Sequence, residues 1–138
     1  MTTPSPAAAP AAVARRALIA GYACTGLAAS FLAFDVTMKV LELAPAMQAT
    51  TALGYPPSSV FWIGVVELVC LALYLVPRTA VLGALLLAGY LGGAVATHVR
   101  VGNPMASHTL FPIYVALFVW GGLYLRDPRL RAVLPLRR

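Results

Sequence analysis

Four long apolar stretches, separated by short polar or proline-containing breaks, account for most of the chain. They cover about residues 17–38, 57–76, 80–99 and 109–125. A helix that crosses a membrane needs about 20 predominantly apolar residues, and each stretch approaches that length. The breaks suit helix ends, because Pro57 fits a first turn, Thr79 fits an N-cap and Pro104 follows a Gly-Asn pair. We therefore predict an all-α fold, a polytopic membrane protein with a four-helix transmembrane bundle.

The positive residues around these stretches are distributed unevenly. The side that carries both termini holds Arg15, Arg16, Arg78, Arg126, Arg129, Arg131, Arg137 and Arg138. The other side holds only Lys39 and Arg100. Because cytoplasmic loops carry the excess of Lys and Arg, we predict that both termini are cytoplasmic. Residues 1–14, rich in Ala and Pro, are expected to form a flexible tail, residues 15–126 the transmembrane domain, and residues 127–138 a basic tail.

A cleaved signal peptide is the alternative interpretation of the first stretch, because an Arg15-Arg16 pair precedes it. The uncharged run from Ala17 to Phe34 is longer than the roughly 7–15 apolar residues of a signal-peptide core. We therefore favour a membrane span.

Composition supports a membrane protein. Hydrophobic residues make up 61% of the chain and charged residues 10%, against roughly 25% charged residues in soluble domains. These values exclude a disordered chain and a conventional water-soluble enzyme. The net charge is +6, and the positive residues flank apolar runs. They do not form basic segments with interleaved aromatics, so we expect no nucleic-acid partner. Arginine greatly outnumbers lysine and alanine is abundant, which is typical of a GC-rich bacterial genome, and we expect the bacterial inner (cytoplasmic) membrane.

A single carboxylate interrupts the second stretch. Glu67 lies about ten residues into it, roughly 15 Å along a helix and near the bilayer midplane. A charge at that depth costs several kcal/mol, so Glu67 is expected to face the bundle interior or to be protonated. Tyr90 lies at the same depth in the third stretch, which runs in the opposite direction. We predict a hydrogen bond between the two side chains.

Small and polar residues recur at helical spacing and predict the packed faces. On the second stretch they are Gly64, Glu67, Cys70 and Tyr74, and on the first they are Gly21, Thr25, Ala28, Leu32, Asp35 and Lys39. Gly89 and Gly93 form a GxxxG pair on the third stretch. Close packing within the bundle is our preferred interpretation of that pair, and a homo-oligomer is the alternative.

A second polar group gathers at the ends of the stretches opposite the termini. Asp35 and Lys39 have the spacing of an ion pair, and His98, Arg100 and His108 are expected in the same outer layer. Two interpretations stay open: a headgroup pocket above Glu67 for a quinone, lipid or other amphiphile, or interfacial residues that extend to water. The histidines match no haem or metal motif, so no metal site is predicted. Cys24 and Cys70 are expected to be small buried hydrophobes.

Three segments resemble the DoxX-like family of small four-helix membrane proteins. They are Leu53-Gly54-Tyr55-Pro56, Gly64-Val65-Val66-Glu67-Leu68, and Pro77-Arg78-Thr79-Ala80-Val81-Leu82-Gly83 leading to Gly89-Tyr90-Leu91-Gly92-Gly93-Ala94-Val95-Ala96-Thr97-His98-Val99-Arg100. Met38-Lys39 also fits the family's end of helix one. The resemblance implies a four-helix bundle over residues 17 to 125 and an association with quinone-linked redox and oxidative-stress complexes. By that resemblance Lys39, Glu67, His98 and Arg100 match the family pattern, whereas Asp35 and Cys70 are not matched.

Three functions follow as hypotheses. The first is a quinone- or quinol-binding subunit, with Glu67 exchanging a proton and a soluble or membrane redox partner supplying electrons. That partner is required because the chain has no catalytic motif and no intrinsic electron carrier. The second is a non-catalytic membrane adaptor, in which Glu67 serves helix packing. The third is a small lipid or solute transporter that works as an oligomer.

Overall fold

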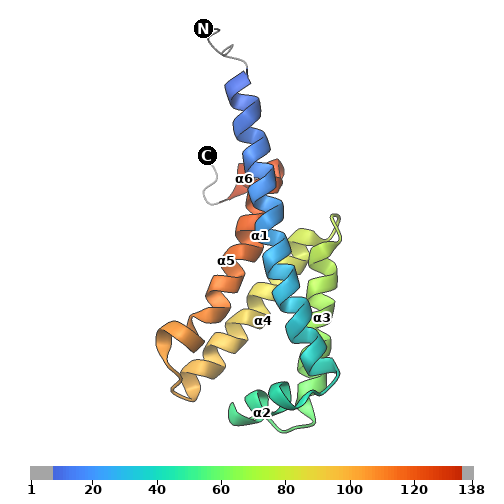
Figure 1. Ribbon diagram of the computed structural model, residues 1–138, viewed down its shortest axis with the longest axis vertical. Coiled ribbons are helices and arrows are strands. Elements are labelled where there is room, and N and C mark those ends of the chain that lie inside the picture. Colours follow the sequence, from blue (N-terminus) through green and yellow to red (C-terminus); the bar gives the residue numbers. More distant parts are fainter. Residues whose placement is uncertain (1–7, 135–138) are drawn as a thin grey trace.

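The computed structural model describes residues 8–134, with side chains from Ala14 onward, and this part is helical without strands (Figure 1). The long helices are α1 (Ala8–Val40), α3 (Ser59–Leu75), α4 (Ala80–Arg100) and α5 (Phe111–Arg126). The short ones are α2 (Ala44–Ala52), a π-helical turn η1 (Met105–Thr109) and α6 (Pro128–Val133). The all-α prediction is confirmed for the described residues.

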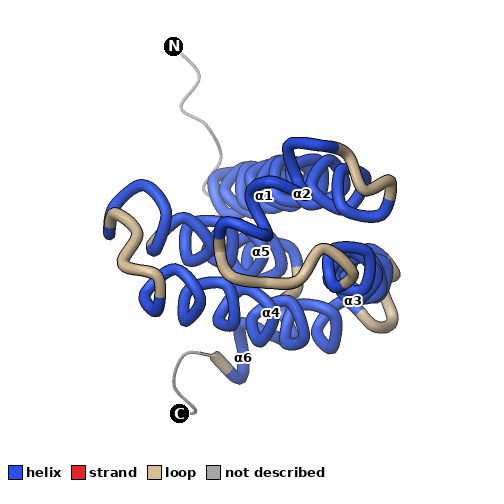
Figure 2. The backbone as a smooth tube through the Cα atoms, turned by 90° about the horizontal axis from the view of Figure 1, so that it is seen from below, coloured by secondary structure: helices blue, strands red, loops and turns tan. Residues whose placement is uncertain are grey.

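The four long helices form a closed ring of neighbours. Helix α1 packs against α3 and α5, and α4 packs against the same two helices on the other side, as the view along the bundle shows (Figure 2). Consecutive long helices run in opposite directions, which is the arrangement expected when short breaks join apolar helices. Side chains of α1, α3 and α4 can therefore meet at one level of the bundle.

Three helical segments are long and apolar enough to cross a membrane: Ala14–Val40, Ala80–Arg100 and Met105–Arg126. Helix α3 is apolar but has 17 residues, because the chain from Pro56 to Ser58 forms a turn in which the Ser59 and Val60 amides donate to the Pro56 and Pro57 carbonyls. Pro57 therefore precedes α3, and its expected place in the first helical turn is wrong.

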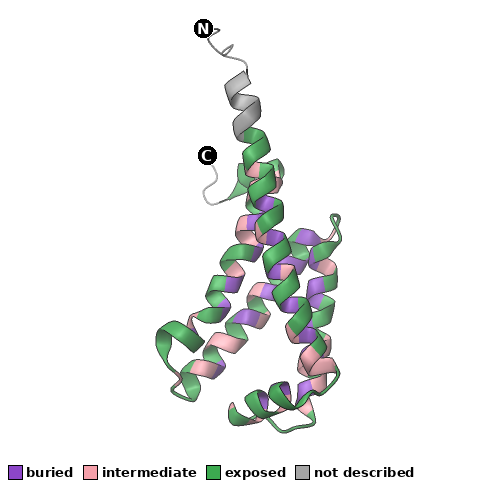
Figure 3. Ribbon diagram, viewed as in Figure 1, coloured by how far each residue is buried: buried purple, intermediate pink, exposed green. Residues whose placement is uncertain are grey.

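The buried residues form a stripe along the facing sides of the long helices, and the outer sides are exposed (Figure 3). Trp62, Ile19 and Leu117 each expose at least 60% of their surface, as expected for side chains that face lipid. The packed faces follow the two predicted stripes, because the residues of the α3 stripe are all buried. On α1 the stripe is buried from Gly21 to Leu32 and half-buried at Asp35 and Lys39. Both stripe predictions are confirmed.

Glycines allow the closest helix approaches. A Cβ at Gly21 would lie 3.0 Å from the Gly122 carbonyl oxygen, and one at Gly64 would lie 2.7 Å from the Lys39 Cβ. A Cβ at Gly83 would overlap the backbone of Tyr74. These contacts let α1 pack closely on α5 and α3, and α3 on α4, which is how small residues stabilise membrane bundles.

The GxxxG pair on α4 does not take part in this packing. A Cβ at Gly89 or Gly93 would meet no described atom within 4 Å, and both residues are exposed. The preferred prediction of close packing within the bundle is therefore wrong for this pair. The physical reason is that α4 turns Ala84, Leu87 and Leu91 toward the core, and the two glycines lie on another face.

Two terminal segments contain more helix than the sequence predicted. Helix α1 begins at Ala8, so the expected flexible tail over residues 1–14 is wrong from Ala8 onward, and residues 1–7 lie outside the described residues. In the expected basic tail, α6 begins where the Asp127 Oδ1 accepts from the Arg129 and Leu130 amides at 2.9 and 3.4 Å. Pro128 suits the first position of that helix.

Candidate functional site

Three helices bring four polar side chains together inside the bundle. Asp35 and Lys39 lie one turn apart near the end of α1, Glu67 lies in the middle of α3, and Tyr90 lies in the middle of α4. Gly64 permits the approach, because its missing side chain leaves room for the Lys39 Cβ one turn away from Glu67. We call these four residues the charged cluster.

The Lys39 ammonium is the centre of the charged cluster. Its Nζ donates to the Asp35 Oδ2 at 2.6 Å, to the Glu67 Oε2 at 2.9 Å and to the Tyr90 hydroxyl at 2.8 Å. The Tyr90 hydroxyl in turn donates to the same Glu67 Oε2 at 2.7 Å. The ammonium thereby uses its three donors, and both carboxyl groups have a cationic partner.

Exposure differs sharply within the charged cluster. The Glu67 side chain is fully buried, Lys39 exposes 14% of its side chain and Asp35 exposes 35%. The cluster thus runs from a partly exposed carboxyl group to a fully buried one. Charge-assisted hydrogen bonds are strong in such a low-dielectric interior, and an unmatched charge there is costly.

One atom of the charged cluster has no partner. The Glu67 Oε1 is buried and accepts no hydrogen bond within the part of the chain that the structure describes. A buried polar atom without a partner typically costs about 1–3 kcal/mol, so such an atom calls for an explanation. Chemically, Oε1 is an acceptor or proton-holding group, and the Lys39 and Tyr90 donors lie on the other oxygen of the same carboxyl group.

Sequence reasoning located most of this geometry. The predicted Glu67–Tyr90 hydrogen bond and the Asp35–Lys39 ion pair are both present. The direct Lys39–Glu67 ion pair was missed, because Lys39 was placed in an outer layer. A lysine side chain is long and its Cβ points back toward the helix N-terminus, which carries its ammonium inward to Glu67.

The remaining predicted site residues lie elsewhere. The His98 and His108 rings pack edge to face with centroids 6.1 Å apart. The His98 Nδ1 lies 2.7 Å from the Asn103 Nδ2, and the His108 Nδ1 lies 2.8 Å from the Ser107 Oγ. Within residues 14–134 no hydrogen bond or ion pair joins either histidine to the charged cluster, so the structure does not bring these residues into direct contact.

Arg100 fixes the loop before α3 at the same end of the bundle. Its Nη2 donates to the Leu53 carbonyl at 2.6 Å, next to Gly54, which has a φ of 87°. Tyr55 continues this loop, and its hydroxyl lies 2.8 Å from the Thr97 Oγ1 of α4. The Tyr55–Thr97 pair was missed, although Thr97 follows Tyr90 by two helical turns and so shares its face.

A second buried network connects α1, α3 and α5 nearer the termini. The fully buried Tyr74 donates its hydroxyl to the Val119 carbonyl at 2.9 Å and lies 3.1 Å from the Thr25 Oγ1. We call Tyr74, Thr25 and the Val119 carbonyl the neutral network. The sequence placed Tyr74 and Thr25 on the packed faces but gave them no partner.

The cysteines and acidic groups form no metal site in the described part of the chain. Cys70 is buried and Cys24 is half-buried, and both are free thiols. No group of three or more His, Cys, Asp or Glu side chains is suitably placed for a metal ion among those residues.

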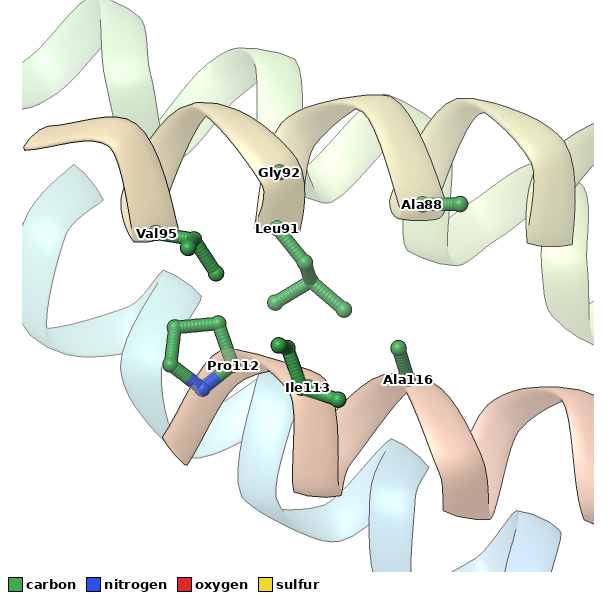
Figure 4. Close-up of a pocket in the computed structure, with 7 residues that line it drawn as sticks. All are labelled: Ala88, Leu91, Gly92, Val95, Pro112, Ile113 and Ala116. Carbon is green, nitrogen blue, oxygen red and sulfur yellow. The ribbon is translucent and has the colours of Figure 1, made fainter. Parts of the chain in front are cut away.

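A small apolar cavity lies between α4 and α5, apart from the charged cluster (Figure 4). Its volume is about 120 Å³. It is lined by Ala88, Leu91, Gly92, Val95, Pro112, Ile113 and Ala116. Ligand pockets usually measure roughly 300–1,000 Å³, so this cavity suits a short piece of hydrocarbon.

A comparison with protein families agrees with the resemblance that the sequence segments indicated. A family model described as the DoxX-like family matches residues 23–122. The matched range contains all four residues of the charged cluster and the three of the neutral network. Comparisons with curated proteins and with solved structures gave no significant match.

Proposed function

The chain belongs to the DoxX-like family, and from that premise we propose that it is a quinone- or quinol-binding subunit of a membrane redox or oxidative-stress complex. We further propose that α1, α3, α4 and α5 all cross the bacterial inner membrane, with both termini on the cytoplasmic side. The excess of arginines on the side of the termini supports that orientation.

The observation that carries the ligand proposal is the buried, unpartnered Oε1 of Glu67. A bundle that needed only a structural link between α1 and α3 would be served by a neutral pair, as at Tyr74 and Thr25. Ionisable groups inside a membrane are costly and mark proton or ligand sites in many proteins. A carboxyl group with one oxygen held and the other free is suited to exchange a proton with a bound molecule.

The residues of the charged cluster fit a quinone headgroup in chemical type. A bound quinone would supply two-electron, two-proton redox chemistry. Glu67 would hold or release a proton at Oε1, Tyr90 would hold the other carboxyl oxygen through the hydrogen bond that its hydroxyl donates to Oε2, and Lys39 would orient both side chains through its own hydrogen bonds to them. Asp35, as the most exposed member, offers the exchange point toward solvent. The cavity between α4 and α5 offers room for part of an apolar tail.

Electrons would come from a redox partner, soluble or membrane-bound. The sequence holds no Rossmann glycine pattern, haem motif or iron–sulfur cysteine set. The chain would therefore supply binding and proton transfer, and its partner would supply the electron carrier.

A membrane adaptor is the second candidate, and one observation favours it. The charged cluster links three helices. Among the described residues, all of its polar side-chain atoms except the Glu67 Oε1 are hydrogen-bonded or accessible to solvent. Such a network can hold a bundle together without binding a ligand. A transporter function has no comparable support from the geometry.

The test is extraction of bound small molecules from protein purified in mild detergent, followed by mass spectrometry. Wild type would be compared with Glu67→Gln and with Glu42→Gln. Glu42 is the matched control, because it is an exposed glutamate outside the long helices and undergoes the same chemical change. Thermal unfolding in detergent would establish that each variant is folded.

The proposal expects near-stoichiometric quinone in wild type and in Glu42→Gln, and a loss of at least about tenfold in Glu67→Gln, equivalent to about 1.4 kcal/mol. Equal quinone in all three proteins would remove Glu67 from the site. A wild-type protein that neither retains nor rebinds added quinone, while Glu67→Gln still assembles with the same partner proteins, would replace the quinone proposal with the adaptor.

A further inference from the structure

Arg126 occupies an unusual position at the end of α5 nearest the termini. Its guanidinium carbon lies 5.6 Å from the ring centroid of Tyr74 and 5.7 Å from that of Tyr22. Both distances fall within the roughly 6 Å over which a cation is attracted to an aromatic face. Tyr74 is fully buried and Tyr22 exposes 63% of its surface, so the guanidinium lies between the packed core and the outer face.

Glycine packing sets this geometry. A Cβ at Gly21 would lie 3.0 Å from the Gly122 carbonyl oxygen and 3.2 Å from the Arg126 amide nitrogen. The absent side chains bring α1 and α5 together at this level and place Tyr22 beside Arg126. The position of the guanidinium thus follows from a close approach of α1 and α5 at Gly21.

The polar edge of this guanidinium is unused. Cation–π contact involves the ring faces, and the in-plane N–H groups stay available to an acceptor. Within residues 14–134 the Arg126 guanidinium makes no hydrogen bond or salt bridge. The adjacent carboxylate, Asp127, uses its Oδ1 to accept the first amides of α6. An arginine with five donors at the end of an apolar helix therefore has no anionic partner among residues 14–134.

The surrounding charge favours an anionic ligand. Arg129 and Arg131 lie on α6, which follows directly, and Arg78 lies in the turn between α3 and α4 at the same end of the bundle (Figure 1). Asp127 is the acidic residue nearest this end, because Glu67 lies in the middle of α3, Asp35 lies near the far end of α1 and Glu42 follows that end. Toward the middle of the bundle, α1 and α5 expose apolar side chains, including Leu27, Leu117 and Phe118.

We propose that Arg126, held between Tyr22 and Tyr74, binds the phosphate of an anionic phospholipid whose acyl chains lie along α1 and α5. Guanidinium groups bind phosphate oxygens through two parallel hydrogen bonds, which matches the free N–H edge. A lipid is favoured over a soluble phosphate compound because α1 and α5, the helices that carry Tyr22 and Arg126, also expose apolar side chains. This site is separate from the charged cluster and does not depend on the proposed quinone function.

The experiment is native mass spectrometry of the full chain in detergent with an equimolar mixture of phosphatidylglycerol and phosphatidylcholine that carry identical acyl chains. Wild type would be compared with Arg126→Gln and with Arg78→Gln. Arg78 is the matched control, since it is an exposed arginine at the same end and has no aromatic or hydrogen-bonding contact among residues 14–134. Tyr22→Leu is a second test variant, because it keeps all charges and removes the exposed aromatic contact.

The proposal predicts that wild type retains phosphatidylglycerol preferentially and that Arg126→Gln lowers this preference about fivefold. Arg78→Gln should lower it less than about twofold, because a remote charge acts only through the surface potential. Tyr22→Leu should fall between the two, and it keeps the test decisive if Arg126→Gln fails to fold. Equal retention of both lipids by wild type, or equal losses in Arg126→Gln and Arg78→Gln, would overturn a specific site. Complete displacement of the lipid by inorganic phosphate would overturn the lipid assignment.

Discussion

The charged cluster and the neutral network occupy the same two packed faces of α1 and α3 but differ in chemistry. In the neutral network, the Tyr74 hydroxyl donates to the Val119 carbonyl and lies within hydrogen-bond distance of the Thr25 hydroxyl. Each polar group of this network therefore has a partner. In the charged cluster, Glu67 is equally buried, yet one of its oxygens has no partner among the described residues. Both regions therefore bury polar groups between α1 and α3, but one does so with neutral hydrogen bonds and the other with an ion pair.

The two regions differ in what burying their polar groups costs. A hydroxyl bonded to a helix carbonyl links two helices at little cost, since no charge leaves water. A buried ion pair gains attraction but has a large desolvation cost, so its contribution to stability is small or negative relative to apolar residues. Retaining Lys39 and Glu67 at that cost supports a role in binding or proton transfer.

The largest expected effect comes from removing the counter-charge. Lys39→Met would leave Glu67 buried without a cation and should lower the free energy of unfolding by about 3–5 kcal/mol. The double variant Lys39→Met/Glu67→Leu should recover to within about 1 kcal/mol of wild type, because the uncompensated charge is gone. Denaturant titration in detergent micelles would measure both. A double variant as unstable as Lys39→Met would show that the ion pair itself stabilises the bundle.

The close helix packing around Tyr74 gives the next effect. Gly83→Ala would force a Cβ into the Tyr74 backbone and should cost about 1–3 kcal/mol. Gly89→Ala on the same helix meets no described atom and should change stability by less than about 1 kcal/mol, in the stabilising direction. The same titration would compare the pair. If Gly89→Ala proved the more damaging, the face that carries Gly89 would have to pack against another molecule, which would support a homo-oligomer.

The smallest effect is expected in the neutral network. Tyr74→Phe removes a hydroxyl bonded to the Val119 carbonyl and should cost about 1 kcal/mol, with quinone content unchanged. Stability and extracted quinone would be measured on the same preparation. Loss of quinone in Tyr74→Phe would show that the two networks are coupled and would end the distinction between them.

Much of the fold follows from the sequence for clear physical reasons. The stripes of small and polar residues predicted the packed faces of α1 and α3, because each helix turns one narrow face to the bundle. The same reasoning failed for Gly89 and Gly93, since a GxxxG spacing indicates a smooth surface without saying what covers it. Helix α2 and the start of α1 at Ala8 were missed because alanine-rich segments carry no strong pattern.

The candidate site was predicted in part. Equal depth on antiparallel helices was enough to pair Glu67 with Tyr90, because rise per residue fixes depth. Depth alone was misleading for Lys39, whose ammonium lies several bonds from its backbone and reaches Glu67 from the end of α1. The local partners of His98 and His108, which are Asn103 and Ser107, depend on the turn after α4, and helical spacing does not determine that turn.

Glu67 is proposed to exchange a proton with a bound quinone, whereas the neutral network only holds helices together. Infrared difference spectroscopy tests this most directly, with quinone added to the purified protein and reduced electrochemically. We expect a carboxyl protonation signal in wild type and in Tyr74→Phe that disappears in Glu67→Gln. An unchanged signal in Glu67→Gln, or no carboxyl signal in a wild-type protein that holds quinone, would contradict it.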